Sequence, residues 1–97
     1  MSDLQVMATI PVKAEAVEQV RPALQALVEA TRAEEGCLAY DLFESGAAPG
    51  TFVTLERWRD ADALDAHMRT PHVAAAFAAA EGALSGDVAI HPLQPVG

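Results

Sequence analysis

The sequence is poor in cysteine and in basic residues. Its one cysteine, Cys37, excludes an intramolecular disulfide and a metal site built from several thiolates. Six lysines and arginines stand against fourteen acidic residues, so the net charge is −8, and the six are scattered along the chain. A surface that follows a phosphate backbone needs clustered basic side chains. We therefore expect neither a nucleic acid nor a membrane as a partner.

Long apolar runs and targeting signals are also missing. No stretch approaches the roughly 18 apolar residues of a membrane-spanning helix. No basic segment followed by an apolar one opens the sequence, so we expect no signal peptide. Together with the single cysteine, these absences predict a cytoplasmic protein.

Aromatic residues make up only 5% of the chain, although 52% of it is hydrophobic and the mean hydropathy is +0.17. We expect one domain over residues 1–97, and a chain of this length buries only a modest core. The remaining apolar side chains need a ligand cavity, a partner surface or both.

The hydrophobic periodicity predicts strands and helices in the order β-α-β-β-α-β, with the second helix broken in two. This order is typical of a ferredoxin-like α+β sandwich, in which four antiparallel strands carry both helices on one face. The strands are expected at 4–12, 37–44, 51–58 and 87–94, and the helical segments at 14–35, 61–69 and 72–84.

Local signals set the helix boundaries. Pro22 interrupts the first helix, so we expect a kink or a restart near Arg21. Gly36 is expected to end that helix in the left-handed conformation. Asp60 and Thr70 are expected to cap the two later helical segments, because their side chains accept hydrogen bonds from a helix N-terminus.

The predicted strands carry apolar residues on both faces. A solvated sheet face would show clean alternation of apolar and polar residues, yet Val53 and Leu55 oppose Phe52 on the third strand. On the second strand we expect one face to hold Leu38, Tyr40 and Leu42. Since the helices cover only one side of the sheet, we expect a second copy of the chain to cover the other, giving a homodimer through the sheet face.

Few residues are candidates for chemistry, because no phosphate-binding loop, nucleophile elbow or HExxH motif is present. His67 and His72 are five residues apart across a proline break, which is poor spacing for two ligands on one helical face. No carboxylate stands in an obvious ligand position beside them. We therefore expect no metal site.

His67 shares the apolar side of its short helix with Leu64 and Met68. Two readings are open. The histidine is half-buried with its ring nitrogens bonded to backbone carbonyls, or it is a base or hydrogen-bond partner in a pocket, since imidazole exchanges a proton near neutral pH.

Glu56 shares a strand face with Phe52 and Trp58. A carboxylate there has to reach solvent, pair with a basic group or line a cavity. Arg57 and Arg59 flank it, although Arg57 is expected to point to the other face, and pairing is the simplest expectation for Glu56. Core packing is the simplest expectation for Trp58.

Two segments carry a family resemblance, EEGCLAYDLFES and PGTFVTLERWRDADALDAHMRTPHVAAAF. They resemble the antibiotic biosynthesis monooxygenase domain, in particular its small quinol-monooxygenase-like members, and the likeness extends over about residues 5–93. The residues that carry it best are Gly36, Cys37, Tyr40, Phe52, Glu56, Trp58, Ala63, Leu64, His67, Thr70, Pro71, His72 and Phe77.

The resemblance implies a dimeric α+β barrel that oxidises a small aromatic quinol or polyphenol with dioxygen and with no cofactor. An electron-rich phenolate can itself reduce oxygen, so the protein has to deprotonate the substrate, exclude water and hold the resulting anions. We expect Glu56 either to orient His67 or to bind a substrate hydroxyl. The implied catalytic residues are His67, Trp58, Glu56 and Tyr40, and the implied substrate pocket holds Phe52, Thr54, Leu64, His72 and Phe77.

Other activities in the same superfamily leave alternatives. The resemblance implies that haem-degrading members carry an asparagine in the first strand and a haem-ligating histidine late in the second helical segment. Here the first strand has no asparagine and the helix AAAFAAAE has no histidine, so haem degradation is disfavoured. An isomerase or tautomerase of a small carbonyl compound would use the same base. A non-catalytic ligand-binding dimer would leave His67 bonded to the backbone only. The enzyme readings require His67, Glu56 and Trp58 to converge on one cavity.

Overall fold

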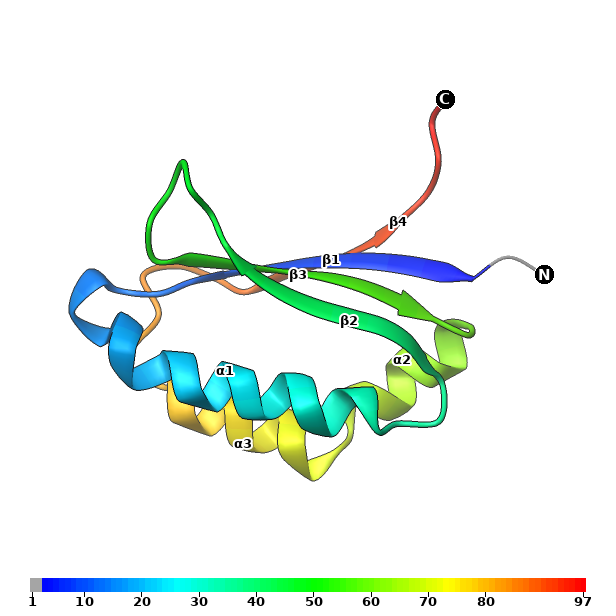
Figure 1. Cartoon of the computed structure of the whole chain (residues 1–97), viewed down its shortest axis with the longest axis horizontal. Helices are drawn as coiled ribbons and strands as arrows, with labels where there is room; N and C mark the ends of the chain where they lie inside the picture. Colours follow the sequence, from blue (N-terminus) through cyan, green and yellow to red (C-terminus); the bar gives the residue numbers. More distant parts are fainter. Residues whose placement is uncertain (1–2) are drawn as a thin grey trace.

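The computed structural model describes residues 3–97, so the first two residues of the expected 1–97 domain lie outside the described part. A four-stranded antiparallel sheet has the strand order β2-β3-β1-β4, and the helices lie on one of its faces (Figure 1). This arrangement confirms the ferredoxin-like α+β fold. The elements are β1 (Leu4–Pro11), a 3-10 turn (Ala14–Ala16), α1 (Val17–Arg32), β2 (Cys37–Glu44), β3 (Thr51–Trp58), α2 (Ala61–Met68), α3 (Pro71–Ala80) and β4 (Ala89–Leu93).

The two strands expected in the middle of the chain have the predicted bounds, but the parity of β2 is different at its start. A bulge lies between Cys37 and Ala39, so an extra residue separates the two faces. Tyr40 and Leu42 share a face as expected, and it is the face toward the helices. Leu38 is exposed, and Cys37 packs against the buried cluster in its place.

The sequence predicted a kink or a restart of the first helix near Arg21, and the helix does not restart there. Its irregularity lies earlier, where the 3-10 turn passes into α1, and Pro22 stands inside the continuous helix. Proline removes one backbone hydrogen bond there, while Val20 and Leu24 on either side of it are buried in the core. That packing stabilises the helix across the proline.

Gly36 does not adopt a left-handed conformation, so this prediction was wrong. The glycines with positive φ in the described part are Gly50 and Gly82. A Cβ on Gly36 would collide with the Cβ of Ala63. Gly36 is therefore required because the connection between α1 and β2 passes close to α2.

Both predicted helix caps are present. The Asp60 carboxylate accepts a hydrogen bond from the Ala63 amide at 2.8 Å, and the Thr70 hydroxyl accepts from the Val73 amide at 3.3 Å. The last helix ends at Ala80 and not at residue 84, and Leu84 forms an isolated bridge with Val12 instead.

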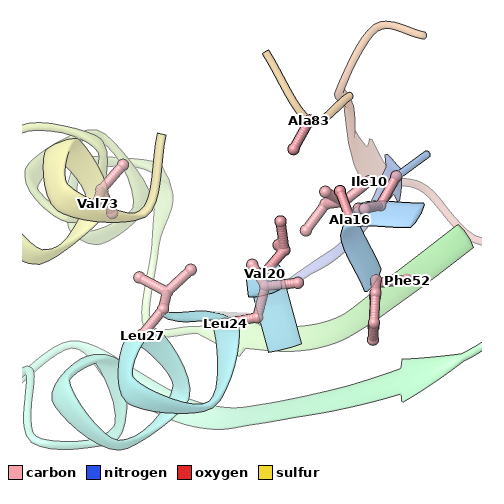
Figure 2. Packing of buried hydrophobic residues seen from close by; sticks show 9 residues of the cluster. Ile10, Ala16, Val20, Leu24, Leu27, Phe52, Val73 and Ala83 are labelled. Atoms are coloured by element: carbon pink, nitrogen blue, oxygen red, sulfur yellow. The ribbon is translucent and has the colours of Figure 1, made fainter. Parts of the chain in front are cut away.

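The core lies between the helices and the sheet. One cluster joins α1, β1, β3 and α3, and Figure 2 shows its members pointing into the space between these elements. A second cluster surrounds Trp58 and includes Val6, Val28, Tyr40 and Ala63. Within residues 3–97, no helix is long and apolar enough to cross a membrane.

Candidate active site

One pocket opens between the helices and the inner face of the sheet. The volume of the cavity itself is about 60 Å³, and it widens into an open mouth. Its walls are apolar residues from β1, β4, α1, α2 and α3, and three polar side chains interrupt them: Tyr40, Glu56 and His67. A mostly apolar cavity with a few convergent polar groups is the usual form of a small-molecule site.

The inner face of β3 supplies a hydrogen-bonded row. Thr54, Glu56 and Trp58 alternate along the strand, so all three point to the helix side. The Trp58 indole N–H donates to Glu56 Oε1 at 2.8 Å, and the Thr54 hydroxyl donates to Oε2 at 2.5 Å. All three side chains are buried. The carboxylate is thus held in one orientation by two neutral donors.

The expected pairing of Glu56 with an arginine is wrong. Strand alternation turns Arg57 to the other face, where its closest acidic partner is Asp3 at 3.8 Å, and Arg59 pairs with Asp60 at 3.5 Å. A carboxylate has about four acceptor positions. Two of those on Glu56 are used by Trp58 and Thr54, so the others remain for a pocket ligand.

His67 is held by a carboxylate that the sequence reasoning missed. Its Nδ1 lies 2.6 Å from Oε2 of Glu34, which follows α1, and the imidazole is buried. Because an ionised carboxylate only accepts, the proton of the neutral imidazole sits on Nδ1. The other nitrogen, Nε2, then carries a lone pair, and His67 lines the pocket.

His72 contacts the same carboxylate oxygen. Its Nε2 lies 2.7 Å from Glu34 Oε2, and the two imidazole centroids are 6.0 Å apart. The premises against a metal site were therefore wrong, because the break between α2 and α3 brings two helices together at Glu34. His72 was expected in the substrate pocket, and it does not belong to the lining of this cavity.

The rings of Tyr40, Trp58 and His67 pack against one another beside the pocket. The Trp58 and His67 centroids are 4.6 Å apart and the Tyr40 and Trp58 centroids 6.4 Å apart, the latter nearly perpendicular. Trp58 is completely buried and stands behind the wall. Burial, and then the negative charge of Glu56, raise the pKa of Tyr40. Its phenol therefore stays protonated and is a hydrogen-bond donor.

Of the other expected pocket residues, Leu64 and Phe77 belong to the lining and Thr54 does not. Phe77 is 46% exposed and lies at the mouth beside Met68 and Ile90, which are exposed as well. Phe52 is outside the lining. It is six residues from Trp58 along β3, roughly 20 Å at the rise of a strand.

The chain is similar to known proteins over nearly its whole length. Residues 4–79 match the family described as "Antibiotic biosynthesis monooxygenase". "Putative monooxygenase YcnE" of Bacillus subtilis is 46% identical over 65 residues, 67% of this chain and 68% of that protein. "Putative monooxygenase Rv0793" of Mycobacterium tuberculosis is 38% identical over 95 residues, 98% of this chain and 93% of that protein.

Solved structures agree with the sequence relatives. The crystal structure of PA3566 from Pseudomonas aeruginosa superposes with a TM-score of 0.89 at 34% identity, covering all of this chain and 97% of its own. A crystal structure titled as an antibiotic biosynthesis monooxygenase gives a TM-score of 0.90 at 38% identity, covering 97% of this chain and 99% of its own. With the fold and the family match in agreement, the chain belongs to the antibiotic biosynthesis monooxygenase family.

Proposed function

We propose that the protein is a cofactor-independent monooxygenase that oxidises a small aromatic quinol or polyphenol with dioxygen. Family membership supports a monooxygenase-like activity in general terms. The observation that carries the finer proposal is the Glu34–His67 pair at the wall of an apolar pocket. It leaves a basic nitrogen where a hydroxyl could bind.

The reaction starts with a proton transfer. The substrate hydroxyl donates to Nε2 of His67, and its proton moves to this nitrogen as the phenolate forms. Glu34 stabilises the imidazolium through Nδ1–H, as the acidic member of a catalytic triad does. The phenolate then supplies the electrons that reduce dioxygen. For a phenol with a free ring position, phenol and O₂ give quinone and water, so atoms and electrons balance without an external reductant.

Glu56 and Tyr40 favour a substrate with a second hydroxyl group. Glu56 accepts a hydrogen bond and the protonated Tyr40 donates one, and both line the pocket with His67. A buried carboxylate repels an anionic ligand. We infer that neutral dihydroxy aromatics bind better than aromatic carboxylates, and that Glu34, not Glu56, orients His67.

We also propose that the protein acts in the cytoplasm as a homodimer that forms through the face of the sheet opposite the helices. Phe43, Leu55 and Leu93 are 52%, 47% and 41% exposed there. They lie on β2, β3 and β4 of the sheet, whose strand order is β2-β3-β1-β4. An apolar sheet face of this kind calls for a partner, and a second copy of the same face is complementary to it.

Isomerisation of a small carbonyl compound is the second candidate function. Tyr40 and His67 favour it, because an acid and a base on one pocket could move a proton between two substrate atoms. A non-catalytic binding role is less well supported. That hypothesis predicts hydrogen bonds from His67 to the backbone only, whereas the imidazole bonds to the side chain of Glu34.

An assay of paired aerobic and anaerobic reactions tests the proposal. Purified protein is incubated with a panel of quinols and polyphenols, with no flavin added, and products are identified by mass spectrometry. We expect a product with one added oxygen atom in air and none under argon. Conversion that continues under argon would establish the isomerase reading instead, and no conversion of any compound would contradict both.

A further inference from the structure

We propose that Glu34, His67 and His72 form a binding site for a divalent metal ion such as Zn²⁺. His67 lies in the last turn of α2, His72 in the first turn of α3, and Glu34 just beyond α1. Their ligand atoms all lie within 4.8 Å of one another. One carboxylate oxygen and two imidazole nitrogens form a ligand set that suits Zn²⁺, Co²⁺, Ni²⁺ or Cu²⁺.

The spacing of the three side chains is close to what a metal requires. Bonds of about 2.0–2.1 Å in a tetrahedron place two ligand atoms roughly 3.3 Å apart. The nitrogens of His67 and His72 lie 2.6 and 2.7 Å from Glu34 Oε2. Each distance therefore has to lengthen by roughly 0.6 Å, which small side-chain rotations provide. The metal replaces the proton between each imidazole and the carboxylate.

Access to the site is from solvent and does not pass through the pocket. The side chains of His72 and Glu34 are 24% and 15% exposed, whereas that of His67 is 5% exposed. Neither His72 nor Glu34 lines the pocket. Three protein ligands leave a fourth position for water. Across residues 3–97, this is the one group of three histidine, cysteine or acidic side chains that comes so close together.

Metal binding has a consequence for the pocket, and this consequence rests on the proposed function. A metal ion occupies the lone pair of Nδ1, so the proton of the neutral His67 imidazole moves to Nε2. His67 then donates a hydrogen bond to a pocket ligand and no longer accepts its proton. Binding of a metal ion at this site therefore inhibits oxidation of the substrate.

Binding is tested first, without any assay of activity. The protein is stripped with a chelator and titrated with ZnCl₂ in a calorimeter, and with CoCl₂ while the visible spectrum is recorded. We expect one saturable equivalent per chain and cobalt bands typical of tetrahedral coordination. His72→Ala should weaken binding at least about tenfold, which is the lower end of what even outer-shell changes cost. Glu34→Gln should do the same if His72→Ala folds poorly.

His91→Ala is the matched control, because His91 is an exposed histidine on β4, away from the cluster. It should bind zinc as the wild type does. The absence of saturable binding in the wild type, or equal affinity in the wild type and His72→Ala, would overturn the proposal. If zinc binds but leaves oxygen uptake unchanged, the inhibition is refuted and the site stands. If zinc binds and the metal-free protein oxidises none of the quinols, only the proposed function fails and the site stands.

Discussion

Glu34 and His67 are 33 residues apart in the chain, yet Oε2 of one lies 2.6 Å from Nδ1 of the other. This contact fixes the tautomer of a buried imidazole at the wall of the pocket. It links the end of α1 to α2, so the helix layer itself presents the proposed base to a substrate.

Glu34→Gln tests the role of this contact. The amide has no charge to stabilise an imidazolium, so we expect kcat to fall about 10²-fold or more with a small change in KM. Steady-state kinetics in the presence of a chelator measure both constants. Glu35→Gln is the matched control, because Glu35 is the neighbouring carboxylate and its side chain is 94% exposed. A loss confined to KM would contradict the orienting role.

The hydroxyl of Thr54 is expected to contribute to stability through Glu56. Thr54→Val removes one of the two donors to a buried carboxylate, which should lower the free energy of unfolding by about 1–3 kcal/mol. Urea denaturation measures this change. Thr51→Val, at the half-buried start of the same strand, should change stability little. Equal effects of the two substitutions would show that the contact to Glu56 is unimportant.

The burial of Tyr40 predicts that the folded protein loses stability at alkaline pH. Burial raises its pKa above the ordinary value near 10, so the folded protein holds the phenol proton more tightly than the unfolded chain does. The resulting stabilisation is complete below about pH 10 and is lost as the pH rises from there through the folded pKa.

The chain has one tyrosine, so tyrosinate absorbance reports this group alone. In folded protein it should titrate above pH 10, and in urea near pH 10. Tyr40→Phe should lose less stability than the wild type above pH 10. Titration at the same pH in folded and unfolded protein would refute the burial effect.

Gly36→Ala should disturb both stability and the site. Its Cβ would meet the Cβ of Ala63 on α2, the helix that carries His67, so α2 has to shift. We expect destabilisation by about 1–3 kcal/mol together with a loss of activity. In Gly46→Ala, the new Cβ meets nothing within 4 Å, and this variant should be as stable as the wild type in thermal denaturation. Equal melting temperatures for the two variants would contradict the close approach.

The homodimer is tested by placing a charge on the open face of the sheet. Leu55 is 47% exposed in the single chain, so Leu55→Asp should fold, and it should convert a dimer into a monomer in sedimentation experiments. Val96→Asp, in the fully exposed tail, should stay dimeric. A wild type that sediments as a monomer would contradict the proposed homodimer.

The features of the fold that the sequence predicted well depend on interactions between residues close together in the chain. The caps at Asp60 and Thr70 and the bounds of β2 and β3 follow from hydrogen bonding and alternation within short segments. The shared face of Thr54, Glu56 and Trp58 follows from alternation as well, and their hydrogen bonds are its direct consequence.

The parts of the site that sequence reasoning missed depend on how distant elements pack. Nothing near Glu34 in the sequence indicates that it meets His67 and His72. The segment EEGC carried the family resemblance, and that was the only signal available. Gly36 was misread for the same reason, because its need for a small side chain comes from Ala63 across the packing of two elements.

The most direct test of the central claim is oxygen uptake by the wild type and by His67→Ala, measured with an oxygen electrode on a quinol substrate without added flavin. His67 is the proposed base, so the variant should lose uptake about 10²-fold or more while it keeps the fold and the assembly state of the wild type. Uptake by a folded His67→Ala at the wild-type rate would contradict the account.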